Sequence, residues 1–163
     1  FSTVHANSAA GAIPRFIDLG VKPASIGPAM NLIIAQRLVR RLCEHCKVPG
    51  KLPSEYETKV KKFFANLPKR VDRKDYEKIT MFQPKGCAKC TGLGYKGRVA
   101  VFELLRVDEE MEALINANVS EGAIAKQAAK QGMVMMQEDG ILKALTGLTT
   151  FDEVEGVTGP LKW

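Results

Sequence analysis

The sequence predicts a mixed α/β fold that carries a small metal-binding insertion, and three observations support this prediction. Residues 98–107 are rich in branched and apolar side chains, which is typical of a buried strand. The residues after 108 place apolar side chains at helical spacing. Two Cys-x-x-Cys motifs, at residues 43–46 and 87–90, have 40 residues between them. We therefore expect three parts: residues 1–42 with strands and helices, 43–97 with the cysteines and a basic loop, and 98–163 with a strand followed by a helical domain.

The first part is expected to contain two strands and two helices. Residues 1–5 resemble the end of a buried strand. Ser8 is a suitable N-cap for a helix that ends before Gly20, a residue that tolerates the left-handed conformation. A second, more apolar helix is predicted at residues 23–34. The alternation of charged and apolar residues at 35–42 favours a strand that leads to the first cysteine.

The remaining elements are predicted from capping residues. Ser54 and Glu57 form a capping-box pattern for a helix that reaches about Asn66. Asp108 and Ser120 are N-cap residues for two helices after the strand. These and later signals predict helices at residues 108–116, 120–131 and 136–145, and a final turn opened by the capping box Thr150-x-x-Glu153.

Four cysteines in two matched pairs indicate a structural zinc site. Cys43, Cys46, Cys87 and Cys90 are the only cysteines of the chain. Two residues between ligands allow a tight turn to aim both sulfurs at one ion, and a structural Zn²⁺ takes four such ligands in a tetrahedron. Redox-active dithiols and disulfides are the alternatives for this pattern. His45 lies between two of the cysteines, and we expect it to be a solvated turn residue because four thiolates already complete the shell.

Composition and charge limit the remaining possibilities. The chain is 45% hydrophobic and 26% charged, and it has no apolar stretch long enough to cross a membrane. Its net charge is +6, and basic residues concentrate around the first cysteine pair and in the loop between the pairs. Such a surface suits an acidic partner, nucleic acid or an acidic lipid surface. Reduced cysteine pairs and the lack of a leader favour a cytoplasmic location. The chain opens without methionine, and we expect it to be the C-terminal piece of a longer protein.

The chain lacks a complete catalytic site of its own. It contains no phosphate-binding G-x-x-x-x-G-K-[ST] motif. The glycines of residues 92–97 neither follow a strand nor open a helix, as a dinucleotide fingerprint requires. His5 is a candidate catalytic residue because it stands at the carboxyl end of the first predicted strand, where ligand-facing groups lie in open α/β sheets. A histidine in an ordinary turn is the alternative for this position.

Several stretches together resemble one family, the hexameric secretion ATPases of type II secretion and type IV pilus assembly. The resemblance rests on residues 2–9, 15, 18–20, 35–46, 86–98, 102–105, 131–133, 138–140 and 147–154, in the order that the family has them. It covers nearly the whole chain except the lysine-rich loop at about residues 50–82. The family usually has threonine where Ala6 stands here, which changes one hydroxyl contact beside His5.

The resemblance implies a function for each part. Residues 1–42 would be the edge of a RecA-like motor domain, with His5 near the γ-phosphate of ATP. Arg37, with Arg40 and Arg41, would serve a neighbouring nucleotide or an acidic partner surface. The ATP and Mg²⁺ would be held mainly by an upstream half of the intact protein, so this piece alone is catalytically incomplete. The zinc module would dock to the inner-membrane platform protein, and the protein would form a homohexamer that is cytoplasmic and peripheral at the inner membrane. A solvent-exposed strand face is the alternative role for Arg37, Arg40 and Arg41.

Two other classes of protein share features with this sequence. A zinc-ribbon module that binds nucleic acid would explain the basic loop, but aromatic stacking residues are not interleaved with its lysines and arginines. We therefore do not expect nucleic acid as a partner. The second cysteine pair also matches the repeat of a chaperone cysteine-rich module, but the residues after Cys46 do not follow that pattern.

Overall fold

A computed structural model describes residues 2–76, 79–117 and 119–163 of the chain. These residues form two compact units, each built from two segments. We call Phe1–Ala35 with Glu103–Met135 the helical unit, and Gln36–Phe102 with Met136–Trp163 the cysteine unit. The described residues contain seven α-helices and two two-stranded sheets, which confirms the mixed α/β class. Within that part of the chain, no helix has both the length and the apolar character needed to cross a membrane.

Four helices build the helical unit: α1 (Ala9–Asp18), α2 (Pro23–Ala29), α4 (Glu109–Ala117) and α5 (Glu121–Lys130). The side chains of Ser8, Asp108 and Ser120 each accept a backbone N–H from the first turn of α1, α4 and α5, as predicted. Gly20 has a φ of +89° and ends α1. The unit has one buried core, whose largest members are Ile13, Ile26, Leu105, Met111, Ile115 and Ile124.

Two predictions for the first part of the chain are wrong. Residues 2–5 form no strand, because no described strand lies beside them to complete a ladder, and residue 1 lies outside the described residues. The second helix ends at Ala29 rather than at residue 34. Pro28 has no N–H to continue the helical hydrogen bonds, and Met30 already has an extended backbone. The branched side chains of residues 33 and 34 therefore join a strand.

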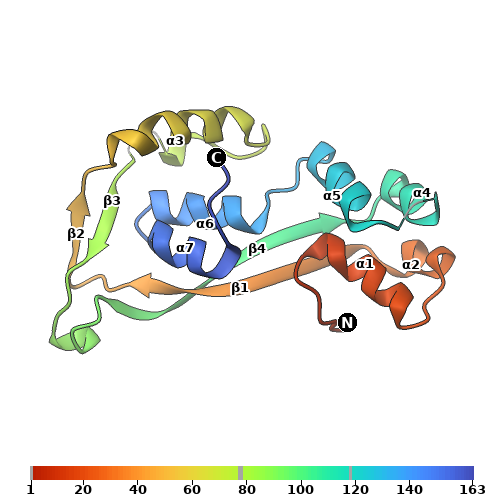
Figure 1. Cartoon of the computed structure of the whole chain (residues 1–163), viewed down its shortest axis with the longest axis horizontal. Coiled ribbons are helices and arrows are strands. Elements are labelled where there is room, and N and C mark those ends of the chain that lie inside the picture. Colours follow the sequence, from red (N-terminus) through yellow and green to blue (C-terminus); the bar gives the residue numbers. More distant parts are fainter. Residues whose placement is uncertain (1, 77–78, 118) are drawn as a thin grey trace. The chain divides into compact units, whose positions relative to one another are not determined.

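The longest strands of the chain pair with each other. β1 (Leu32–Leu42) and β4 (Tyr95–Arg106) form a two-stranded antiparallel sheet (Figure 1). Along β4, Val101, Glu103 and Leu105 are buried, whereas the residues between them are exposed. This period of two is typical of a strand with one covered face. The strands predicted at residues 35–42 and 98–107 are thus confirmed, and both start earlier than predicted.

The cysteine unit contains two short paired strands, β2 (Lys47–Gly50) and β3 (Met81–Pro84). It also contains three helices, α3 (Ser54–Asn66), α6 (Met136–Leu145) and α7 (Phe151–Thr158). β2 and β3 are antiparallel, with Lys47 opposite Pro84 and Gly50 opposite Met81. Short 3-10 turns occupy residues 74–76 and 88–90. In Figure 1, β2 and β3 run side by side from the cysteines to α3.

The capping boxes of this unit differ from the prediction. α3 ends at Asn66 as predicted, but its N-cap is Pro53, and Ser54 is already the first helical residue. The hydroxyl of Ser54 is therefore one position too late to cap the helix. At the start of α7, Thr150 accepts the N–H of Glu153, which confirms half of the second box. The Glu153 carboxylate points instead to Arg40, and the helix extends over two turns rather than one.

Candidate metal centre

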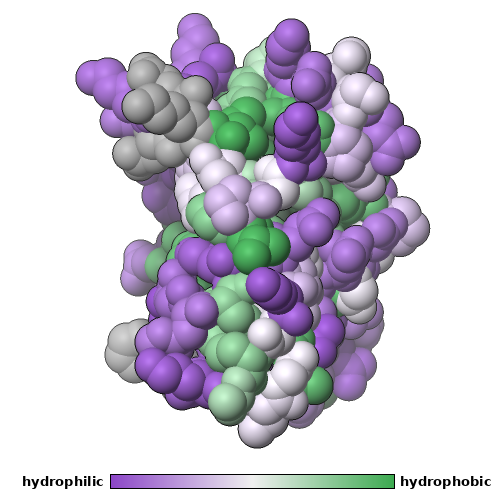
Figure 2. Space-filling view, turned by 90° about the vertical axis from the view of Figure 1, so that its left-hand side faces the viewer, coloured by the Kyte–Doolittle hydropathy of each residue, from purple (hydrophilic) through white to green (hydrophobic). Residues whose placement is uncertain are grey.

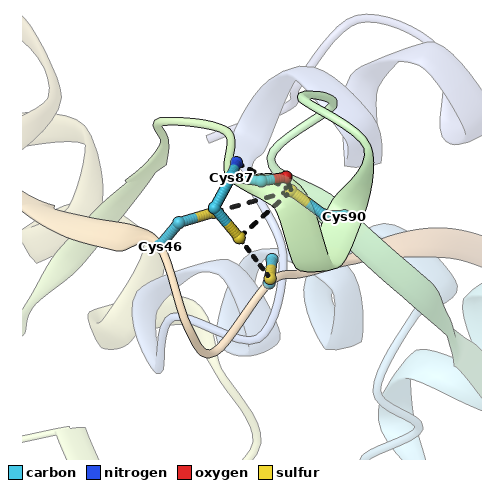
Figure 3. A group of neighbouring side chains, drawn as sticks. Cys46, Cys87 and Cys90 are labelled. Atoms are coloured by element: carbon cyan, nitrogen blue, oxygen red, sulfur yellow. Dashed lines mark hydrogen bonds between the residues drawn. The ribbon is translucent and has the colours of Figure 1, made fainter.

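Both Cys-x-x-Cys motifs lie where the chain passes from one pair of strands to the other. The first connects β1 to β2, and the second connects β3 to β4. We call these two segments, residues 43–46 and 87–90, the knuckles. Because β1 pairs with β4 and β2 pairs with β3, the knuckles meet at the junction of two ladders. Figure 3 shows Cys46, Cys87 and Cys90 with their sulfurs directed toward one another.

The four sulfurs converge on one point. All four lie within 4.8 Å of one another. The Sγ–Sγ distance is 4.0 Å from Cys43 to Cys87, 3.7 Å from Cys46 to Cys90, and 3.8 Å from Cys87 to Cys90. All four cysteines are free thiols, and three of them are buried. A disulfide requires a sulfur–sulfur distance of about 2.05 Å, so the spacing does not correspond to disulfide pairing.

These distances match what a tetrahedral ion requires. A Zn–S bond of about 2.3 Å places the corners of a tetrahedron about 3.8 Å apart. The spacing within and between the knuckles is close to this value. The donor set consists only of sulfur, which selects soft or borderline ions such as Zn²⁺ over Mg²⁺ or Ca²⁺. The four clustered cysteines can therefore hold a metal ion.

Backbone amides support the sulfurs, and glycine makes this arrangement possible. The N–H groups of Cys87 and Gly94 each donate to Cys90 Sγ at 3.2 Å. Gly94 has a φ of +76°, and a Cβ there would lie 2.4 Å from Cβ of Pro84. Only glycine fits this conformation and this close approach. The positive φ of Gly94, four residues after Cys90, thus allows its amide to point back toward the sulfur.

The environment of the cluster favours one thiolate before a metal arrives. Burial opposes ionisation of Cys90, but hydrogen bonds from the Cys87 and Gly94 amides and from neighbouring thiols lower its pKa to about 6. Burial, together with the neighbouring sulfurs, raises the pKa of Cys46 to about 12. Negative charge thus starts on Cys90, where the amides are aimed. Since metal ligands must be thiolates, binding of an ion releases the remaining protons.

Lys47 connects the first knuckle to the turn between α6 and α7. Its Nζ donates to the carbonyl oxygen of Gly147 at 3.1 Å and pairs with Glu44 at 2.8 Å. It also lies 4.7 Å from the centroid of the Phe82 ring. The hydrogen bond from Lys47 is the main cause that lowers the pKa of Glu44. Nothing in the sequence pairs position 47 with position 147, so this contact could not be predicted.

Basic side chains are exposed around the knuckles, beside the apolar side chain of Leu93, which is 65% exposed. His45 is exposed, as predicted, and its Nδ1 lies 3.5 Å from Nζ of Lys89. Arg41 and Lys51 are exposed as well. Figure 2 views the molecule from the side of β2 and β3 and shows mainly hydrophilic side chains with separate hydrophobic spots. The charge therefore suits an acidic partner better than an apolar one.

The other candidate residues lie apart from the cluster of sulfurs. His5 is an exposed residue of the helical unit and precedes α1 by a short turn. Arg37 is an exposed residue on β1, in the cysteine unit. Neither is among the residues that could hold the ion. Their catalytic and nucleotide-binding roles therefore remain predictions from the resemblance.

Two tight glycines mark packing in the cysteine unit that the sequence did not indicate. A Cβ on Gly147 would lie 2.2 Å from the Phe82 ring, and one on Gly140 would lie 2.6 Å from Val154. The first contact joins β3 to the turn after α6, and the second joins α6 to α7. The spacing of apolar residues predicted the helix, but the sequence could not predict which side chain packs against each glycine.

Two Cys-x-x-Cys knuckles at the junction of two strand pairs define a tetracysteine module that can hold a metal ion within an α/β protein. The sequence profile of the family described as type II/IV secretion system protein matches residues 1–156. The chain belongs to this family. This confirms the resemblance drawn from its motifs.

Named relatives agree with this assignment. The type IV pilus assembly ATPase PilB of Thermus thermophilus is 40% identical over 94% of this chain and 16% of its own length. The PilB of Pseudomonas aeruginosa is 35% identical over 96% of the chain and 26% of its own length. The type II secretion system ATPase E of Vibrio cholerae is 36% identical over 96% of the chain and 29% of its own length. The chain therefore spans less than a third of each of these relatives.

Proposed function

We propose that this chain is the C-terminal part of a hexameric motor ATPase that powers type IV pilus assembly or type II protein secretion. The family match over residues 1–156 supports the assignment to a secretion or pilus ATPase. The fraction of each relative that the chain covers leaves room for a motor half that holds ATP and Mg²⁺. The intact protein would work in the cytoplasm, at the inner membrane.

The observation that carries the proposal is the convergence of four sulfurs from two passages of the chain. Zn²⁺ bound to Cys43, Cys46, Cys87 and Cys90 would fix the junction of the β1–β4 and β2–β3 ladders. A structural ion of this kind supplies folding free energy that a loop-rich segment cannot obtain from a core. Such a stiff junction suits a module that docks to the platform protein and transmits force to it.

His5 and Arg37 would act on the nucleotide in this proposal. His5 is exposed before α1, where its imidazole can approach a γ-phosphate held by the motor half. Arg37 is exposed on β1, where a guanidinium can approach a phosphate or an acidic surface. Phosphoryl transfer needs positioning and charge stabilisation more than covalent chemistry from the protein, which both side chains can supply.

The complete protein that contains this chain tests the proposal. His5→Ala should lower kcat for ATP hydrolysis at least tenfold and leave bound zinc unchanged. The double substitution Cys87→Ser with Cys90→Ser should abolish bound zinc and the production of pili or secreted protein, with Lys51→Ala as the matched surface control. Normal pilus or secretion output from a zinc-free protein would contradict the docking role. Steeply salt-dependent binding of DNA by the wild type would favour the zinc-ribbon alternative instead.

A further inference from the structure

The last five residues of the chain, Gly159–Trp163, lie outside the residues that the family profile matches. They nevertheless have defined partners within the cysteine unit. They follow α7 and meet α3, which lies in the lysine-rich loop (Figure 1). We call residues 159–163 the tail.

A single side chain of α6 binds the main chain of the tail. Gln137 Nε2 donates to the carbonyl oxygens of Gly159 and Pro160 at 3.0 and 3.1 Å, and to the hydroxyl of Thr158 at 3.0 Å. Its Oε1 accepts the N–H of Lys162 at 2.7 Å. The side-chain amide thus donates to main-chain acceptors and accepts from a main-chain donor of one short segment. Contacts of this kind fix the position of a peptide segment whatever its side chains are.

An aromatic pocket receives the end of the same segment. The Trp163 ring centroid lies 5.4 Å from that of Tyr56 and 6.2 Å from that of Phe63, both on α3. It also lies 5.4 Å from the ring of Phe151 on α7, in an edge-to-face arrangement. Tyr56 and Phe151 stack on each other at 5.5 Å. The indole is therefore held by three rings from two helices, at distances that favour aromatic attraction.

These contacts also attach α3 to the rest of the unit. α3 has no side-chain N-cap, and Lys61 and Lys62 are exposed to solvent, whereas Nζ of Lys59 lies 5.0 Å from the centroid of the Tyr56 ring. The inner face of α3 uses Tyr56 and Phe63 to reach Phe151 and Trp163. Removal of the indole would leave those rings without one of their main neighbours.

We propose that Gln137 and the rings of Tyr56, Phe63 and Phe151 form a binding site for a short peptide segment that carries an indole. The tail is the ligand of this site in the present structure, where it latches α3 to α6 and α7. Since the backbone contacts and the aromatic pocket are separate, the site recognises a peptide by one main-chain clamp and one anchor side chain. This proposal does not depend on the motor function.

The experiment uses the chain truncated after Thr158 and a synthetic peptide with the sequence of the tail. Trp163 is the only tryptophan of the chain, so the peptide then carries the only indole in the sample. A saturable blue shift of its fluorescence on addition of the truncated chain is expected. Gln137→Ala in the truncated chain should weaken this binding at least tenfold, whereas the matched control Gln127→Ala should leave it unchanged. Absence of a saturable shift, with circular dichroism and bound metal equal to the wild type, overturns the proposal.

A second measurement needs no truncation and applies if the shortened chain fails to fold. In the intact chain, Gln137→Ala should at least double the acrylamide quenching constant of Trp163 and shift its emission to the red. The control Gln127→Ala should change neither quantity. Unchanged quenching in the Gln137→Ala variant would show that the amide does not hold the tail, and the proposal would fail.

Discussion

Substitution of Gly94 by alanine tests the geometry of the second knuckle. Gly94 has a φ of +76°, and a left-handed conformation costs an L-residue about 1–2 kcal/mol. The new Cβ would also lie 2.4 Å from Cβ and 3.0 Å from Cα of Pro84, atoms that a rigid ring and the main chain hold in place. Overpacking of this kind costs about 1–3 kcal/mol. The two effects together predict a loss of about 2–5 kcal/mol, from the sum of these ranges.

Gly92 provides the matched control. Its φ is +82°, but a Cβ there would meet no atom within 4 Å. Gly92→Ala should therefore cost only the conformational strain, about 1–2 kcal/mol. Cys90, a proposed zinc ligand, accepts the Gly94 N–H, and the carbonyl of Cys87, another proposed ligand, accepts the Gly92 N–H. We therefore expect both losses to appear in the affinity for zinc. Each 1.4 kcal/mol corresponds to a factor of about ten, so Gly94→Ala should weaken zinc about 5- to 150-fold more than Gly92→Ala.

The assay is competition for zinc with a coloured chelator at fixed pH, on anaerobically purified protein. Circular dichroism of each variant checks that the helices are retained. Equal affinities for Gly92→Ala and Gly94→Ala would refute the reasoning, because they would mean that the contact with Pro84 does not constrain the knuckle.

Two further predictions concern stability. The hydrogen bond from Arg40 is the main cause that holds the pKa of Glu153 below its usual value. The ion pair therefore contributes to the free energy of unfolding at pH values above the usual carboxyl pKa. This contribution is lost as the pH falls through the lowered pKa of Glu153. Glu153→Gln should therefore destabilise the chain by about 0.5–1 kcal/mol at pH 7 in urea unfolding and by less at pH 3, with Glu155→Gln as control; a pH-independent difference would contradict this. A Cβ on Gly140 would lie 2.6 Å from Cγ1 of Val154, so Gly140→Ala should cost about 1–3 kcal/mol. Gly156→Ala, which meets no atom within 4 Å, should stabilise α7 by about 0.5–1 kcal/mol, and the same sign for both variants would show that α6 and α7 do not pack as described.

The sequence predicted the elements whose signals are local. Ser8, Asp108 and Ser120 cap helices because an N-cap acts within one turn of itself. The prediction that each cysteine pair forms one tight turn succeeded for the same reason, because only two residues separate the cysteines. The convergence of both pairs was an inference from chemistry, and the sulfur distances now support it.

The errors arose where a local signal competed with its surroundings. Ser54 looked like a cap, but the extended backbone of Pro53 starts the helix one residue earlier. Residues 33 and 34 fitted a helical pattern, yet pairing with β4 draws them into a strand. Contacts between distant positions could not be predicted from the sequence. The hydrogen bond from the Arg40 N–H to the Glu153 carboxylate, 113 residues apart, is an example.

The functional residues were predictable to different degrees. The spacing of the cysteines alone predicts a metal site, so this site could be located without comparison with related proteins. The roles proposed for His5 and Arg37 would depend on groups from outside this chain, and their own surroundings do not reveal a nucleotide. Gln137 and Trp163 gave no signal in the sequence because their contacts join three helices and the tail.

Metal analysis of the purified chain is the most direct measurement of the central claim. We predict one zinc ion per chain by mass spectrometry of the elements, with all four thiols protected from alkylation until a chelator removes the ion. A zinc content near zero in protein purified without chelators, or thiols that react at once, would contradict the assignment of a structural ion to the two knuckles.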